Sequence, residues 1–107
     1  MVEKELQRKV NEFLRKANVF FYHPREGKKG TDGVPDVVGC CNSFFFAIEL
    51  KSDRYKDARK GLRKEQINMI ERIRENGGFV LITNNFDEVV EFINKLKRLK
   101  CRSLLKK

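Results

Sequence analysis

Two carboxylates interrupt the most apolar part of this chain, and they constrain its fold more than any other feature. Asp36 stands between Pro35 and two valines, and Glu49 stands between Ile48 and Leu50. Burying an ionised carboxylate without a partner is costly, so each one needs a cation, a metal or a strong set of hydrogen bonds. A structural ion pair would readily explain one of these carboxylates, and it explains the two together less well.

The two carboxylates lie on segments that the sequence predicts to pair. Residues 34–41 and 43–50 are rich in β-branched and aromatic side chains and are separated by one residue, which indicates a hairpin with a tight turn. Side chains alternate along a strand, so Glu49 and Lys51 share a face, about 6–7 Å apart at about 3.3 Å per residue. The alternate residues of that strand point to the core. We therefore expect Asp36, Glu49 and Lys51 to meet at one place.

The remaining sequence alternates between helical and extended patterns. Helical spacing covers residues 2–17, and short apolar runs at 18–22 and 79–83 are typical of strands, of which we expect the second to be buried. A second helix has an apolar stripe of Leu62, Met69, Ile70 and Ile73, on which the amide of Gln66 is out of place, and it ends at Asn76-Gly77-Gly78. A third helix follows Asn85, with Glu88 placed to complete a capping box. We predict one α/β domain over residues 1–107 with the order α-β-β-β-α-β-α and a C-terminal helix. The run of apolar residues before Glu49 indicates a central strand covered by helices on at least one side.

The charge balance points to a polyanionic partner. There are 24 basic and 15 acidic residues, which gives a net charge of +9. A small domain this basic most often meets nucleic acid, with solubility alone as the alternative. The basic C-terminal tail, about residues 95–107, is either a solvated helix end or a further DNA contact. The candidate phosphate contacts in the Gly-rich loop at 24–33 and in the polar stretch at 52–64 are Arg25, Lys28, Lys29, Lys56, Arg59, Lys60, Arg63 and Lys64.

Scarce residue types exclude several chemistries. His23 is the single histidine, which rules out a zinc site with two histidines, and we expect it at a strand end or in a loop. The three cysteines, Cys40, Cys41 and Cys101, show no Cys-x-x-Cys spacing and are expected to be reduced thiols packed as small hydrophobes. Reduced thiols indicate the cytoplasm, that of the host if the chain is phage-encoded. We expect no signal peptide and no membrane span, because the N-terminus is charged and no apolar run approaches about 18 residues.

Two carboxylates and a lysine on a basic domain predict metal-dependent phosphodiester hydrolysis. Hard oxygen ligands suit Mg²⁺ or Mn²⁺ rather than zinc. A bound divalent ion lowers the pKa of its water and neutralises charge in the transition state. Lys51 is placed to orient or deprotonate that water, or to stabilise the developing charge. No organic cofactor is expected.

The motifs resemble those of a known nuclease superfamily. Pro35-Asp36, twelve intervening residues and Glu49-Leu50-Lys51 resemble the PD-(D/E)XK signature of restriction-endonuclease-like nucleases. The resemblance implies an α-β-β-β-α-β core around a mixed central sheet flanked by helices. Gly33-Val34-Pro35-Asp36, a Gln66 that opens the next helix and Gly77-Gly78 resemble the VRR-NUC (virus-type replication-repair nuclease) group more closely. The basic stretch at 52–64 is longer than the short turn expected there, which leaves the substrate preference open.

The resemblance also implies roles for individual residues. It implies a Mg²⁺ site, with Mn²⁺ able to substitute, at Asp36, Glu49, Leu50 and a glutamate of the first helix. Glu3 and Glu5 are both available, and we choose Glu3 because it shares the face of the buried stripe. Gln66 would hold a metal-bound water or a phosphate, and the alternative is a boundary glutamine bonded to a backbone carbonyl.

These observations predict a Mg²⁺-dependent, structure-specific endonuclease that acts in DNA repair or recombination on branched DNA such as four-way (Holliday) junctions. Resolving a junction needs two opposed cuts, so we expect a homodimer. Phe92 and Leu99 of the last helix are candidates for its interface. The alternatives are a flap, nicking or restriction-type endonuclease, or a non-catalytic DNA-binding protein on the same fold, and RNA stays open as a substrate.

Overall fold

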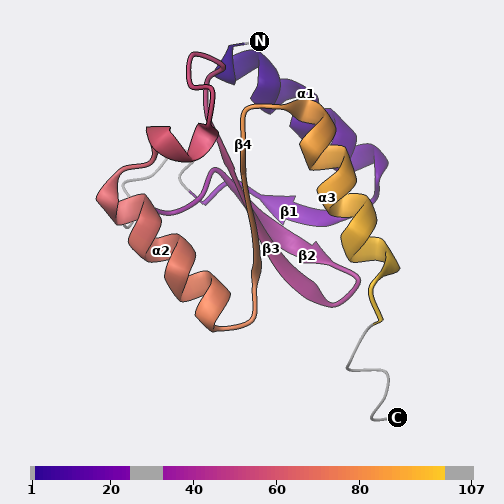
Figure 1. Cartoon of the computed structure of the whole chain (residues 1–107). Coiled ribbons are helices and arrows are strands. Elements are labelled where there is room, and N and C mark those ends of the chain that lie inside the picture. The colour runs from indigo at the N-terminus through magenta and orange to yellow at the C-terminus, as the bar shows by residue number, and fades with distance from the viewer. Residues whose placement is uncertain (1, 25–32, 101–107) are drawn as a thin grey trace.

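The elements follow the order predicted from the sequence (Figure 1). The computed structural model describes residues 2–24 and 33–100. Its helices are α1 (Glu3–Lys16), α2 (Lys64–Glu75) and α3 (Phe86–Arg98), and a short 3-10 helix, η1 (Ala58–Gly61), precedes α2. Its strands are β1 (Phe20–Tyr22), β2 (Val37–Cys41), β3 (Phe44–Leu50) and β4 (Phe79–Thr83).

The four strands form one mixed sheet in the order β1-β2-β3-β4. The first three run antiparallel to their neighbours, and β4 is parallel to β3 after the crossover through η1 and α2. The prediction that β3 is central is therefore confirmed. The prediction that the strand at 79–83 is buried is wrong, because β4 lies at the sheet edge and only Thr83 in it is buried. A short apolar run looks the same in a central strand and in an edge strand that is covered on one side.

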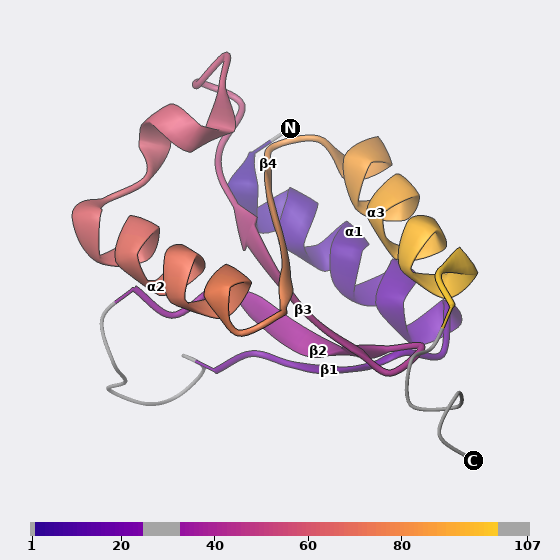
Figure 2. The same cartoon turned by 60° about the horizontal axis from the view of Figure 1, so that its bottom comes forward.

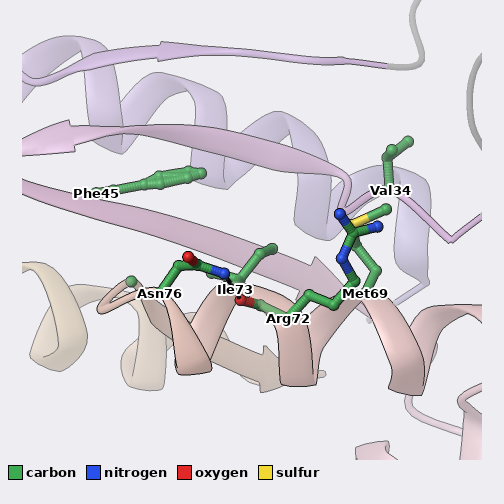
Figure 3. A pocket seen from close by; sticks show the side chains of 7 residues that line it. Val34, Phe45, Met69, Arg72, Ile73 and Asn76 are labelled. Atoms are coloured by element: carbon green, nitrogen blue, oxygen red, sulfur yellow. Dashed lines mark hydrogen bonds between the residues drawn. The ribbon is translucent and has the colours of Figure 1, made fainter.

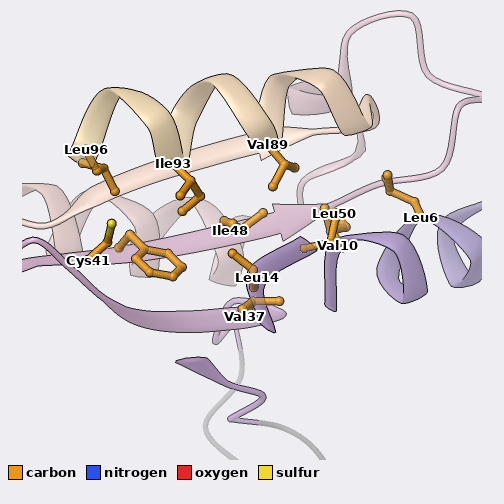
Figure 4. Packing of buried hydrophobic residues seen from close by; sticks show 11 residues of the cluster. Leu6, Val10, Leu14, Val37, Cys41, Ile48, Leu50, Val89, Ile93 and Leu96 are labelled. Atoms are coloured by element: carbon orange, nitrogen blue, oxygen red, sulfur yellow. The ribbon is translucent and has the colours of Figure 1, made fainter. Parts of the chain in front are cut away.

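Helices cover both faces of the sheet (Figure 2). α1 and α3 lie side by side on one face, and α2 lies on the other. The main core is between the sheet and the α1–α3 layer (Figure 4), and it consists of Leu6, Val10, Leu14, Val37, Cys41, Phe46, Ile48, Leu50, Val89, Ile93 and Leu96. Alternate residues of β3 enter this core, as predicted, which directs Glu49 to the α2 face. Cys40 was expected to be packed, but it is exposed because it alternates with the buried Cys41.

The turn between β2 and β3 is tied to the end of α3. Asn42 and Ser43 both have positive φ, 55° and 75°, so the connection takes two residues rather than the one that the sequence suggested. The Asn42 side-chain amide donates to the carbonyls of Leu96 at 2.9 Å and Leu99 at 2.6 Å. The last carbonyls of a helix lack the usual donor four residues on, and these bonds supply a donor in its place. The hairpin that carries Glu49 is thus fixed to the helical layer at its far end.

Two local expectations differ from the structure. Asn85 caps α3 by accepting a hydrogen bond from Asp87 N–H at 2.8 Å, but Glu88 does not complete the capping box. Glu88 instead accepts from the Thr83 hydroxyl. Leu62 was placed on the apolar stripe of α2, and it precedes that helix, which begins at Lys64. In the part of the chain that the structure describes, no helix is both long and apolar enough to cross a membrane.

Candidate active site

Asp36 and Glu49 face each other where β2 begins and β3 ends. The antiparallel register pairs Val37 with Ile48, so the residues one step further out lie opposite each other. Asp36 Oδ2 accepts the Leu50 N–H at 2.8 Å, and the backbone N–H of Asp36 donates to the Glu49 carboxylate. This cross-strand exchange holds both carboxylates at one end of the hairpin, as the spacing predicted.

Gln66, in the first turn of α2, joins Glu49 to Lys51. Its Nε2 donates to Glu49 Oε2 at 2.5 Å, and its Oε1 accepts from Lys51 Nζ at 3.2 Å and from Arg63 N–H at 2.8 Å. A carboxylate only accepts and a backbone N–H only donates, so these partners fix the orientation of the amide. Lys51 Nζ also lies 3.6 Å from Glu49 Oε2. The side chain that seemed out of place on an apolar stripe therefore binds two candidate catalytic residues rather than a backbone carbonyl.

The part of the site that contains Glu49 is buried. Glu49 and Gln66 are each 3% exposed. Burial and the nearby carboxylate of Asp36 raise the pKa of Glu49 to about 7, and Lys51 and the hydrogen bonds to Glu49 only partly oppose them. A buried carboxylate that is short of positive charge, with a second carboxylate beside it, is an arrangement suited to a divalent cation.

A comparison with known families shows the family of the chain. Residues 2–104 match the family model described as archaeal Holliday junction resolvase. The chain belongs to the archaeal Holliday junction resolvase family. This family is part of the PD-(D/E)XK-like nuclease superfamily, and its resolvases are structure-specific endonucleases that act on branched DNA. The predicted superfamily and the predicted activity on branched DNA are confirmed, whereas the match does not show the VRR-NUC group itself.

The resolvase has a third carboxylate near this pair. Glu3 begins α1, and partial burial together with the charge of Asp36 raises its pKa, while Lys51 opposes the shift. The Glu3 carboxyl is therefore close enough to interact electrostatically with Asp36 and Lys51. Among residues 2–24 and 33–100, no three acidic, histidine or cysteine side chains are gathered tightly enough to hold a metal by themselves. Leu50 has its side chain in the core, so it could offer only its backbone carbonyl.

The choice between the two glutamates of α1 is testable. We expect Glu3→Gln to reduce junction cleavage at limiting Mg²⁺ by about 10-fold, because a carboxylate near the cation contributes to its charge balance. Glu5→Gln is the matched control, two residues along the same helix, and should cleave like the wild type. Titrating Mg²⁺ in a gel assay measures both. A larger loss with Glu5→Gln than with Glu3→Gln would assign the helix carboxylate to Glu5.

His23 also belongs to the surroundings of the site, which the sequence did not indicate. It follows β1, and its Nδ1 lies 3.1 Å from the backbone carbonyl oxygen of Asp36. A carbonyl only accepts, so this ring nitrogen carries the proton and donates. The pairing of Tyr22 with Val38 carries residue 23 towards Asp36. Only that register, which is not visible in the sequence, could have indicated the contact.

The predicted phosphate contacts fall into two groups. Arg25, Lys28 and Lys29 lie outside the described residues. Lys56, Lys60 and Lys64 are exposed between β3 and the first turn of α2, and Arg59 and Arg63 are exposed there too. Arg59 is held by Asp57 through two side-chain bonds of 3.0 and 2.9 Å, so part of its charge is already compensated.

Proposed function

We propose that this resolvase cuts four-way DNA junctions as a Mg²⁺-dependent homodimer, with Asp36, Glu49 and Lys51 as catalytic residues and Gln66 at the same site. The observation that carries the proposal is the buried Glu49 beside Asp36 and Lys51, in a chain of the junction resolvase family. The shared motif residues also support a relationship to the VRR-NUC group within the superfamily.

The donor set fits Mg²⁺, with Mn²⁺ as a substitute. Asp36, Glu49 and the Leu50 carbonyl offer hard oxygen atoms, and Glu3 adds charge nearby. Mg²⁺ usually takes only one or two protein carboxylates and keeps water and substrate oxygens in its other positions, so a complete protein cage is not required. When bound, the ion supplies charge neutralisation at the phosphate and a water of lowered pKa.

The remaining roles, positioning and charge stabilisation, belong to groups of the chain itself. Gln66 holds Glu49 and Lys51 in fixed positions, and the Leu50 N–H fixes one oxygen of Asp36. The Lys51 ammonium then stays beside the carboxylates, where it can stabilise charge that develops on a phosphate oxygen or orient the attacking water. Preorganised groups of this kind need not rearrange during the reaction.

A second copy of the chain is needed because each copy carries one such site. We place the docking surface for that copy at the apolar groove between α2 and the sheet (Figure 3). It has a volume of about 410 Å³, and it is lined by Val34, Phe45, Met69, Arg72, Ile73, Asn76 and Gly78. The earlier candidate Phe92 is half-buried and packs edge-on against the core residue Phe46, with ring centroids 6.3 Å apart. Leu99 remains exposed on the opposite face of the sheet.

The dimer surface can be tested with two variants of similar exposure. Phe45 is 38% exposed and Leu99 is 42% exposed, so a glutamate at either position should be tolerated by the fold. We expect Phe45→Glu to weaken the dimer at least 100-fold, because it places a charge in the apolar contact. Leu99→Glu should remain dimeric. Sedimentation equilibrium at micromolar concentration separates these outcomes, and the reverse pattern would move the interface to α3.

The substrate preference is tested with a panel of single-stranded, duplex, flap and four-way-junction DNA, with Mg²⁺ or with EDTA. The expected result is cleavage of the junction in Mg²⁺ and no cleavage in EDTA. Cleavage of the flap with an intact junction would replace this proposal with the flap or nicking alternative.

A further inference from the structure

The segment between β3 and α2, residues 52–63, begins and ends at the active site; we call it the basic arm. Lys51 immediately precedes it, and Arg63 is its last residue. The side-chain oxygen of Gln66 accepts hydrogen bonds from both, at 3.2 Å from Lys51 Nζ and at 2.8 Å from Arg63 N–H. A change in the path of the arm therefore disturbs the two hydrogen bonds that Gln66 accepts.

A side chain from the neighbouring strand end holds the arm. Asn84 follows β4, and its Nδ2 donates to the Tyr55 carbonyl at 2.6 Å, with the Ser52 carbonyl at 3.5 Å. The preceding residue, Thr83, accepts the Lys51 N–H on its own carbonyl at 2.9 Å. The last residue of β4 and the residue after it thus fix the backbone of Lys51 and the start of the arm.

The arm is closed on itself by Tyr55. The Tyr55 ring lies against Gly61, where an added Cβ would come within 2.8 Å of the ring. The Arg54 guanidinium lies 5.0 Å from the centre of the same ring, and it donates to the Tyr55 hydroxyl at 3.0 Å. The bond from Asn84 to the Tyr55 backbone therefore positions the residue around which the arm folds.

The arm buries little apolar surface of its own. Ala58 is its one buried residue, and most of its other side chains are charged and exposed. A segment with many like charges and a small apolar contact would otherwise sample many conformations. Arg59 is paired with Asp57, Arg63 lies 3.7 Å from a carboxylate oxygen of Glu65, and Arg54 lies on Tyr55. The exposed Lys56 and Lys60 are therefore the better placed cations for a partner.

We propose that Asn84 is a positioning residue of the resolvase, which fixes the basic arm so that Lys56 and Lys60 bind backbone phosphates of the DNA beside the scissile bond. This rests on the proposed junction cleavage, and it adds a residue that does not touch the reacting atoms. Fixing the arm before DNA binds reduces the conformational entropy lost on binding. Removing the Asn84 side chain therefore weakens the phosphate contacts themselves.

The test measures junction binding in EDTA over a series of salt concentrations, so that cleavage plays no part. Each lost phosphate contact should lower the slope of log affinity against log salt by about one. Lys56→Ala with Lys60→Ala should lower it by about two, and Asn84→Ala should lower it by a similar amount. Adding Asn84→Ala to the two lysine changes should cause no further loss, because the same contacts are already gone. The exposed Asn94→Ala on α3 is the matched control and should bind like the wild type.

Two more variants keep the result decisive. Asn84→Asp keeps the size of the side chain but loses its donor, and it should behave as Asn84→Ala does. Gly61→Ala displaces Tyr55 without touching Asn84, and it should lower the slope as well.

An unchanged slope in Asn84→Ala and Asn84→Asp, with only a lower melting temperature, would make Asn84 purely structural. An unchanged slope in the lysine double variant would remove the arm from the DNA. If the wild type and the variants bind junctions with these slopes but the wild type cuts none in Mg²⁺, the proposed function is overturned and only the DNA contact of the arm, with its dependence on Asn84, is retained.

Discussion

Asp36→Asn, Glu49→Gln and Lys51→Ala should each lower the rate of junction cleavage by about 10³-fold or more, while junction binding in EDTA changes little. The expectation follows from the position of these groups at one end of the hairpin, where they share charge and hydrogen bonds. Removing one preorganised charged group from such a site typically costs about 10²–10³-fold or more in rate. Single-turnover cleavage with saturating protein measures the chemical step without the contribution of binding.

The matched control for this set is Lys64→Ala, an exposed lysine at the start of α2. It should alter the salt dependence of binding and leave the single-turnover rate within about 3-fold of the wild type. Normal turnover by Lys51→Ala in Mg²⁺ would remove Lys51 from the catalytic group. Loss of binding in the Asp36 or Glu49 variants would indicate that these carboxylates support the fold rather than the chemistry.

The same Glu49→Gln change should stabilise the metal-free protein. The pKa of Glu49 is raised from 4.5 to about 7, so between those pH values the folded protein holds a proton that the unfolded chain has lost. Raising the pH through this window therefore lowers the free energy of unfolding, by about 3 kcal/mol once Glu49 is fully ionised. A glutamine keeps an oxygen that can accept the Gln66 amide hydrogen bond and carries no charge to desolvate.

Thermal unfolding in EDTA at pH 5 and pH 8 measures this effect. At pH 8 Glu49→Gln should exceed the wild type by about 1–3 kcal/mol, and at pH 5 the difference should shrink towards zero. Saturating Mg²⁺ should stabilise the wild type and not the variant, since an ion that binds only the folded state shifts the unfolding equilibrium. A wild type that is the more stable protein at pH 8 without metal would contradict the burial of an under-compensated carboxylate.

Local patterns in the sequence were enough to predict the centre of the site. The distance in sequence between Asp36 and Glu49 fits one antiparallel register, and strand alternation places Lys51 on the same face as Glu49. Gln66 was noticeable because an amide stood on an apolar helical stripe. Glu3 was preferred over Glu5 from the helical face alone. The structure places Glu3 within electrostatic reach of Asp36 and Lys51, and its role at the metal stays a prediction.

The contacts that the sequence could not predict depend on long-range pairing. His23 reaches the backbone of Asp36 only because β1 pairs with β2 in one register. Asn84 reaches the basic arm because β4 lies parallel to β3, which brings the turn after β4 beside Lys51. Nothing in the local sequence distinguishes Asn84 from the capping residue Asn85. Such positions become visible only when the topology is known.

The most direct test of the account uses a supercoiled plasmid that extrudes a four-way junction, incubated with the resolvase and Mg²⁺. Two symmetric cuts within one bound complex convert the circle directly to linear DNA, and the account predicts linear product from the earliest times, none of it with Asp36→Asn. Accumulation of nicked circles that become linear only later would contradict the paired, dimeric cut.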